Sequence, residues 1–208
     1  MKYYIYLAGF LFMLMGLEAV AQTEAAYNHD KIAILPFHFE GLGTRGKKTV
    51  EDVQQHDMEK SLNCQERLYN VLTENKDRLL VDIQEWETTN DLLKKGNIDL
   101  RKAFVMDKMK LCQLLGVDAI LVAEMKEKVV PAYNRTTYNP GTNSYSPRNT
   151  TDQVNYVYVT FFDGKTGHKI WQWDDINNPL NWSNTKRLDK ALTRVFKEMR
   201  AKFPYTKL

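Results

Sequence analysis

The stretch Leu111–Glu124, LCQLLGVDAILVAE, decides the fold of this chain. Its first residues have helical spacing, and Gly116 stands where the end of a helix needs the left-handed conformation. Ala119–Ala123 is then an apolar run of strand length, too short for a helix. A helix that ends at a glycine and leads into a buried strand is typical of α/β proteins. We therefore expect a helix to Leu115 and a strand within Asp118–Val130.

The chain before this stretch contains the first two strands of the expected sheet. Apolar runs predict strands at Lys31–Phe37 and Leu79–Gln84. Pro36 indicates that the end of the first strand lacks a neighbour on one side. Helices with recognisable starts or ends are expected over Val50–Asn75, from a cap at Thr89 to Gly96, and from a cap at Asp99 to Leu115.

The chain after Gln153 predicts a hairpin and a final helix. Val154–Phe162 alternates as a strand, and Lys169–Trp173 is its partner across a glycine-bounded turn. A polar linker, Asp174–Trp182, leads to a helix capped by Ser183 or Asn184. Pro204 ends the pattern. One apolar face of this helix is formed by Leu188, Leu192, Val195, Phe196, Met199 and Phe203.

The element order is therefore β-α-β-α-α-β-β-β-α. Strands joined by helices should be parallel, and the last three should form an antiparallel meander. We expect one α/β domain over residues 31–208, with a single mixed five-stranded sheet and helices packed on it. Residues 22–30 are a polar lead-in.

The first 21 residues have the pattern of a secretory signal peptide. Lys2 supplies a positive start, Tyr4–Leu17 an apolar core of about 14 residues, and Ala19–Ala21 a small-residue cleavage site. The mature chain is expected to begin at Gln22 and to be exported, to the periplasm or the periphery of the outer membrane. No cysteine lies near the cleavage site, so a lipoprotein is not expected. The net charge of +3 is too small to indicate a nucleic-acid partner.

Residues 131–153 differ in composition from the rest of the chain. They are rich in tyrosine, asparagine, threonine, proline and glycine, with few aliphatic residues, and Asn139-Pro140-Gly141 signals a turn. A loop of this length is usually functional or disordered. We expect this insert to be dispensable for folding. Its candidate partner contacts are Tyr133, Tyr138 and Tyr145.

The same pattern resembles the superfamily that includes the TolB amino-terminal domain and the curli-secretion protein CsgG. The matching segments are KIAILPF at 31–37, LLVD at 79–82, LLGVDAILVAE at 114–124 and DGKTGHKIW at 163–171. The segment at 89–96 and the closing FPY at 203–205 are similar to a group of small exported proteins of Bacteroidetes-type bacteria. The resemblance implies the mixed sheet and a place in the cell envelope.

The resemblance also implies an alternative role as a ring or pore-forming secretion subunit. Pore-forming relatives carry a lipobox cysteine and amphipathic membrane hairpins. This chain has no lipobox, and its insert does not alternate apolar and polar residues.

Residues that could carry catalysis or bind a cofactor do not form a convincing site. Gly41–Lys48 is one residue short of a phosphate-binding loop, and Thr49 is one position late to bind a metal. Cys64 and Cys112 lie in apolar helical patterns, so two buried free thiols are favoured. A disulfide between them is the alternative, which the sequence leaves undecided. The four histidines are scattered: His29, His38, His56 and His168. We expect no catalytic residues, no metal and no small-molecule cofactor.

Two other surface patterns are candidates for contact. The final helix has a basic stripe opposite its apolar face, formed by Lys186, Lys190, Arg194 and Lys197. Such a stripe is usually a solvated helix face, and the alternative is contact with anionic lipid or an acidic partner. The predicted hairpin is crowded with aromatic residues, for which cross-strand packing is the default and carbohydrate or peptide stacking the alternative.

The sequence therefore predicts a non-enzymatic envelope module for binding or assembly. Its partner would be an envelope protein or a second copy of itself. A hydrolase of unknown substrate is a further alternative to the pore subunit.

Overall fold

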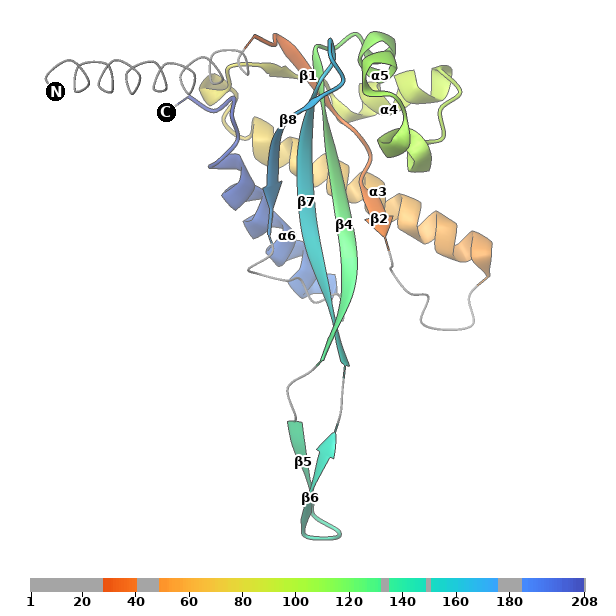
Figure 1. Cartoon of the computed structure of the whole chain (residues 1–208), viewed down its shortest axis with the longest axis vertical. Coiled ribbons are helices and arrows are strands. Elements are labelled where there is room, and N and C mark those ends of the chain that lie inside the picture. Colours follow the sequence, from red (N-terminus) through yellow and green to blue (C-terminus); the bar gives the residue numbers. More distant parts are fainter. Residues whose placement is uncertain (1–27, 41–48, 132–134, 149–150, 176–184, 208) are drawn as a thin grey trace, which may run out of the picture.

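The computed structural model describes residues 28–40, 49–131, 135–148, 151–175 and 185–207. Figure 1 shows a body of sheet and helices, from which a long two-stranded ribbon projects and continues into a separate hairpin. The described helices include none that is both long and apolar enough to cross a bilayer.

One mixed sheet of six strands forms the centre of the body, which confirms the predicted fold class. The strand order is β3-β1-β4-β7-β8, and β2 pairs with β4 beyond the end of β1. The pairs β1–β3, β1–β4 and β2–β4 are parallel, whereas β4–β7 and β7–β8 are antiparallel. The strands are β1 Lys31–Ile34, β2 His38–Glu40, β3 Asp82–Ile83, β4 Ala119–Pro131, β7 Thr151–Asp163 and β8 Lys169–Asp174.

The first expected strand, Lys31–Phe37, ends at Ile34, and a strand that was not predicted follows Pro36 and Phe37, so the sheet has six strands instead of five. Proline has no N–H for the ladder, and the chain leaves the sheet before it returns as β2. Helix α3 (Val50–Thr73) supplies the missing partners. Gln65 Nε2 donates to the carbonyl of Ile34 at 2.8 Å, and Ser61 Oγ donates to that of Phe37 at 2.7 Å.

The second strand is shorter than predicted. Only Asp82 and Ile83 pair with β1, because the C-terminal segment lies beside the residues before them. The N–H of Leu80 donates to the carbonyl of Tyr205 at 2.8 Å, and the N–H of Lys207 donates to the carbonyl of Arg78 at 2.7 Å.

Two predicted helix caps are wrong. Helix α4 (Trp86–Lys95) begins before Thr89, whose hydroxyl instead donates to Gln84 inside the body. Asp99 caps the short 3₁₀ helix η2 (Leu100–Val105), and Asp107 caps α5 (Lys108–Leu115). The end of α5 is as expected, with Gly116 at φ 64°.

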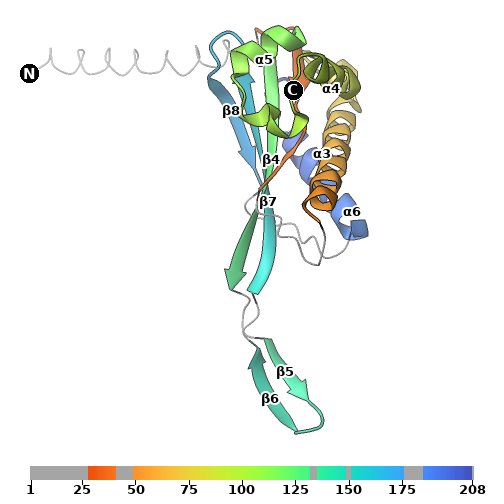
Figure 2. The same cartoon turned by 90° about the vertical axis from the view of Figure 1, so that its right-hand side faces the viewer.

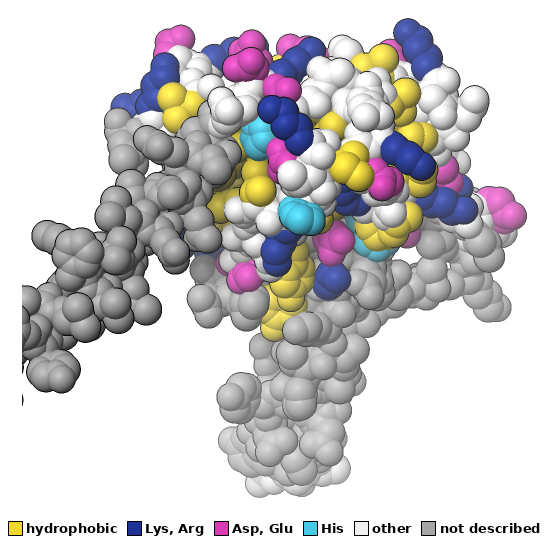
Figure 3. All heavy atoms as spheres, turned by 45° about the horizontal axis from the view of Figure 1, so that its top comes forward, with side chains coloured by type: hydrophobic (Ala, Val, Ile, Leu, Met, Phe, Trp, Pro, Cys, Tyr) yellow, Lys and Arg dark blue, Asp and Glu magenta, His cyan; other side chains and the backbone are white. Residues whose placement is uncertain are grey.

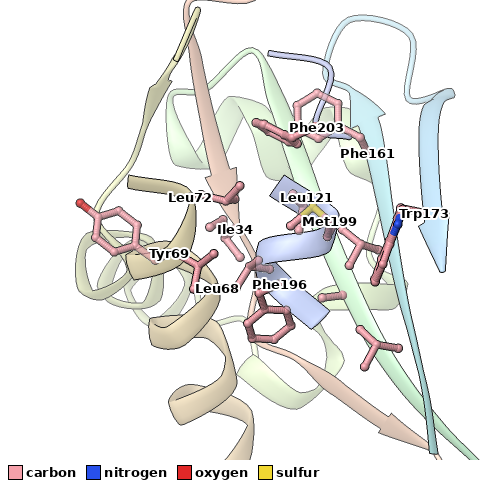
Figure 4. Close-up of a cluster of buried hydrophobic side chains, with 14 of the residues drawn as sticks. Ile34, Leu68, Tyr69, Leu72, Leu121, Phe161, Trp173, Phe196, Met199 and Phe203 are labelled. Atoms are coloured by element: carbon pink, nitrogen blue, oxygen red, sulfur yellow. The ribbon is translucent and has the colours of Figure 1, made fainter. Parts of the chain in front are cut away.

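The buried side chains form two clusters on opposite faces of the sheet, and Figure 2 shows α3 and α6 together on one side of it. One cluster of buried side chains lies between the sheet, α3 and α6 (Thr185–Arg200), and Figure 4 shows its centre around Leu121, Phe161 and Phe196. The second lies on the opposite face under α4, η2 and α5, and contains Ile120 and Val122. Because side chains alternate along a strand, β4 supplies both clusters.

The apolar face predicted for α6 is confirmed where it is described. Leu192, Val195, Phe196 and Met199 are buried, whereas the side chain of Leu188 is outside the described part. Phe203 is also buried, although it lies beyond the end of the helix.

The insert at 131–153 is not a structureless loop, contrary to expectation. β4 runs through Pro131, β7 starts at Thr151, and a hairpin of β5 (Arg135–Asn139) and β6 (Ser144–Arg148) lies between them. Threonine and tyrosine favour extended strands, and this preference outweighs the polar composition. The predicted turn at Asn139–Gly141 does connect the two strands.

Candidate functional site

The residues predicted as partner contacts lie in two separate places. Tyr138 and Tyr145 are direct partners across the β5–β6 hairpin. Tyr133 is outside the described residues, and the side chains of Tyr145 and Lys186 are not described. The lysines and arginine of the basic stripe lie on α6, at the side of the body. Figures 1 and 2 show from two directions that the hairpin stands apart from every helix.

The tip of the hairpin is a small polar surface that includes the exposed ring of Tyr138. Tyr138 is 46% exposed, and its hydroxyl donates to Asn143 Oδ1 at 2.8 Å. Asn143 has a φ of 47°, a conformation that asparagine tolerates in turns. The hydroxyls of Thr142 and Ser144 are 2.8 Å apart. These bonds hold the turn in one shape and present a ring beside hydrogen-bonding groups.

The ribbon below the body has two strand edges without a described neighbour. β4 and β7 pair along all 13 residues, from Ala119↔Asp163 to Pro131↔Thr151. However, β2 ends opposite Lys126, and β8 ends opposite Tyr158. Beyond these levels, no described strand pairs with the outer edge of β4 or of β7. Unpaired N–H and C=O groups on such an edge can accept another strand.

Hydrogen bonds closer to the body show which residues face each outer edge. The carbonyl of Val157 in β7 accepts from the N–H of Asp175 at 3.1 Å, on the β8 side. Backbone direction alternates along an antiparallel strand, so Thr151, Gln153 and Asn155 also direct their N–H and C=O groups outward. We call the segment Thr151–Asn155 the β7 edge.

The opposite side of the ribbon follows the same rule. The carbonyl of Leu121 in β4 accepts from Leu35 at 2.9 Å, on the β1 side. The backbone groups of Glu127, Val129 and Pro131 therefore point away from β7. We call the segment Glu127–Pro131 the β4 edge.

Two of the four residues of the basic stripe on α6, Arg194 and Lys197, lie near acidic side chains. Arg194 lies 3.8 Å from Glu198, and Lys197 lies 3.8 Å from Glu74. Arg200 contacts the same Glu74 at 2.6 Å, and this hydrogen bond, together with Lys197, lowers the pKa of Glu74. Lys190 is exposed. Because Arg194 and Lys197 already lie near carboxylates, this face is a weaker candidate for an anionic partner than its sequence suggested.

The sheet face below α5 carries a polar and aromatic surface that sequence reasoning did not identify as such. Lys126 Nζ lies 3.2 Å from Glu124 and 5.7 Å from the centre of the Tyr158 ring. His38 stacks on Phe104 with ring centres 3.5 Å apart. Figure 3 shows that hydrophobic, basic, acidic and histidine side chains alternate over this side of the body. The face therefore has no field of one sign.

A buried histidine joins three distant segments at the top of the body. His29 Nδ1 lies 2.5 Å from the Tyr205 hydroxyl, and His29 Nε2 lies 2.9 Å from Asp163 Oδ1. Burial would raise the pKa of Asp163, but hydrogen bonds from Thr166 and His29 lower it to about 2. His29 is 6% exposed and Tyr205 is fully buried, so both rings are packed inside the body. We call these three residues the histidine clamp, and its role is structural.

The other groups considered for chemistry lie apart from one another. Cys64 and Cys112 are not joined by a disulfide and are buried in different clusters, on opposite faces of the sheet. Burial raises the pKa of the Cys112 thiol to about 12, which makes it a poor nucleophile. No three metal-binding side chains come together in the described ranges. The glycine-rich stretch Gly41–Lys48 lies outside them.

Comparison with known proteins gives distant likeness in structure alone. Neither a protein-family model nor a curated protein matches the chain. Lipoprotein GNA1162 from Neisseria meningitidis superposes over 83% of this chain and 99% of its own, with 14% identity and a TM-score of 0.47. A single-substitution variant of the PelC dodecamer from Paraburkholderia phytofirmans superposes over 86% of this chain and 89% of its own, with 11% identity and a TM-score of 0.43.

The LpoB C-terminal domain from Salmonella enterica covers 73% of this chain and 82% of its own, with 6% identity and a TM-score of 0.35. At such scores the likeness says nothing of function. The resemblance to the TolB and CsgG superfamily stays a prediction.

Proposed function

We propose that this protein is a non-enzymatic module of the bacterial cell envelope for binding or assembly, and that the ribbon and hairpin together form the arm that contacts a protein partner. The observation that carries the proposal is the position of the arm. β4 and β7 continue past both helical layers, and the hairpin stands clear of the body (Figure 1). The envelope location rests on the signal-peptide pattern of residues 1–21.

The low intrinsic stability of the arm favours a role in contact with a partner. A two-stranded ribbon is marginally stable in water, because it lacks a second layer on which to bury side chains. The arm therefore adds little to folding, yet it exposes strand edges and the Tyr138 ring. Its tyrosine, asparagine and serine content is typical of adaptable protein contacts. Within the described residues, nothing favours the pore-subunit or hydrolase alternatives, which stay untested predictions.

Site-specific crosslinking in cells tests this proposal. A photo-crosslinking amino acid would replace Tyr138 on the hairpin, Lys190 on α6, or Lys95 at the exposed end of α4. We expect the Tyr138 variant to give a discrete crosslinked product, identified by mass spectrometry, and the Lys95 variant to give none. A product from Lys190 alone would move the interface to α6 and overturn the role of the arm.

A further inference from the structure

We propose that the outer surface of η2 and α5 binds the headgroup region of an anionic lipid bilayer. The inference goes beyond the proposed function, because this surface lies at the opposite end of the molecule from the hairpin (Figure 1). We call it the α5 patch. It consists of four apolar and two basic residues: Val105, Met106, Met109, Leu114, Lys102 and Lys110.

Exposed hydrophobic side chains gather in this part of the chain. Seven large hydrophobic residues are exposed in the described ranges, and four of them lie between positions 105 and 114. Val105 is 64% exposed, more than any of the others, and Met106, Met109 and Leu114 are 40%, 39% and 36% exposed. Single exposed hydrophobic residues are ordinary on a protein surface, but a group of four points to a contact surface.

Helical spacing places this group on one side of α5. Leu111, Cys112 and Leu115 are buried in the second cluster, against the sheet. The remaining residues of the helix after Lys108 face solvent, at the three- and four-residue intervals that align side chains along a helix: Met109, Lys110, Gln113 and Leu114. Met106 is exposed directly before the Asp107 cap, so the surface continues from the end of η2 onto α5.

The same part of the chain is basic. Residues 94–116 contain six basic and two acidic residues, whereas the net charge of the whole chain is only +3. Both acidic side chains are engaged locally. Asp99 lies 2.8 Å from the neighbouring arginine, and Asp107 accepts from the N–H of Lys110 at 2.9 Å. The ammonium groups of Lys102 and Lys110 are exposed and form no ion pair within the part of the chain that the structure describes.

An anionic bilayer satisfies both kinds of side chain in the patch. Its outer layer of phosphates attracts lysine, and the acyl chains directly beneath it accept apolar side chains. Long lysine side chains can keep their charge among the headgroups while an adjacent valine or methionine enters more deeply. An acidic protein surface would satisfy the lysines only, and it is the alternative outcome of the test.

The position of the patch is compatible with a free arm. Figures 1 and 2 show α5 at one end of the body and the hairpin beyond the other end. A bilayer at the α5 patch therefore leaves the hairpin clear of the lipid. The protein could bind a membrane with one end and a protein partner with the other.

Co-sedimentation with lipid vesicles tests the inference. The experiment uses the chain that begins at Gln22, because the apolar stretch Tyr4–Leu17 would bind lipid by itself. We expect this chain to sediment with phosphatidylcholine vesicles that contain about one-third phosphatidylglycerol, and not with vesicles of phosphatidylcholine alone. High salt should weaken the binding, because it screens the charge of the lysines.

Two double variants distinguish the α5 patch from the basic residues of the C-terminal helix. Lys102→Gln combined with Lys110→Gln should weaken binding to the anionic vesicles roughly fivefold for each lysine. Lys190→Gln combined with Lys202→Gln removes the same charge from exposed positions on α6 and just after it, and should bind as the wild type does. All four lysines are exposed, so both variants should melt within a few degrees of the wild type.

A second pair of variants tests the apolar part of the patch. Val105→Ser should weaken binding to the anionic vesicles about tenfold, because the valine side chain leaves water when it enters the headgroup region. Leu80→Ser replaces another exposed hydrophobic residue, which lies outside the patch, and should have no effect.

A fluorescent label reports which end of the molecule meets the lipid. An environment-sensitive dye on Met106→Cys should shift its emission to shorter wavelength when anionic vesicles are added. The same dye on Tyr138→Cys should not, because the hairpin lies at the far end (Figure 1). The native cysteines, Cys64 and Cys112, are buried and should not take the dye.

Several results would overturn the inference. A chain that does not sediment with the anionic vesicles, or that sediments equally with the neutral ones, would refute an anionic bilayer as the ligand. Equal losses in the two double lysine variants would refute the assignment to α5. If soluble polyglutamate binds as tightly as the vesicles and Val105→Ser has no effect, the patch binds an acidic protein instead. None of these results changes the Tyr138 crosslink, which tests the proposed function separately.

Discussion

The upper and lower halves of β4 and β7 belong to one continuous ladder, yet they are held in place differently. Above Lys126, both faces of the ladder are covered and residues such as Leu121 and Val122 are buried. Below it, no described strand flanks the ladder, and β4 and β7 pair only with each other. The length of these strands is therefore not set by the core. The body supplies the stability, and the extension is available for contact.

The largest effect should come from a charge in the body. Val122 is 3% exposed in the cluster under α5, so Val122→Asp would bury an unpaired carboxylate at a cost of several kcal/mol. That approaches the total stability of a domain. We expect circular dichroism to show that the variant is unfolded. Thr160→Asp is the control, because Thr160 is the half-buried partner of Val122 in β7 and should remain folded.

A smaller loss is expected where the β7–β8 turn meets α5. A Cβ added at Gly164 would lie 2.4 Å from the carbonyl oxygen of Asp118 and 2.7 Å from Cys112 Sγ. Gly164→Ala should therefore lower the free energy of unfolding by about 1–3 kcal/mol, as overpacking usually does. Gly141→Ala, in the exposed turn of the hairpin, should leave the free energy of unfolding unchanged when both variants are measured by chemical denaturation. Equal losses at the two glycines would contradict the contrast between body and arm.

The histidine clamp should make the stability of the body depend on acid. The pKa of Asp163 is about 2 in the folded chain, below the ordinary value of about 3.9, so the folded state binds fewer protons. Its contribution is present above about pH 4 and is lost as the pH falls through 2. Urea titrations should show Asp163→Asn less stable by roughly 1–3 kcal/mol at pH 6. This gap should close towards pH 2.

The pH dependence of stability also distinguishes the body from the arm. A chain without the hairpin should follow the wild type across the pH range, because the clamp lies at the other end of the molecule. A parallel offset of Asp163→Asn at every pH would show that the carboxylate acts by packing alone.

The smallest effect on stability is expected from removal of the hairpin itself. Replacement of residues 134–150 by a short glycine-serine linker should shift the melting midpoint by a few degrees at most, because closure entropy changes slowly with loop length. The same replacement removes Tyr138 and with it the crosslinking position. It should also reduce partner binding, measured by light scattering. A large loss of stability would show that the arm is part of the folding unit.

Local signals explain what the sequence predicted well. The helix end at Gly116 and the strand at Ala119 follow from features within a few residues of each other. The parallel pairing of β1 with β3 and β4 follows from the helices that connect them. The failures involve distant partners. Thr89 has the chemistry of a cap, but α4 begins earlier, at Trp86, which packs against the first cluster. Composition alone could not show that residues 135–148 pair as strands.

The candidate site was predicted in part. The sequence predicted the insert as a contact region, and this stays a prediction. It could not predict the strand edges, because the direction of a backbone N–H depends on register with a neighbouring strand. The basic stripe was visible, but the ion pair of Lys197 with Glu74 was not, because Glu74 lies just after α3, more than 100 residues away. No spacing rule links His29 to Tyr205, which are separated by 176 positions.

The histidine clamp also fixes a mechanical direction. It ties Tyr205, His29 and the end of β7 at the top of the molecule, whereas the hairpin lies at the bottom (Figure 1). A pull between the two ends runs along the strands, so the hydrogen bonds between β1 and β4 are loaded in shear and share the force. The body would then transmit tension from the arm to residue 29, which lies just before the first strand of the sheet.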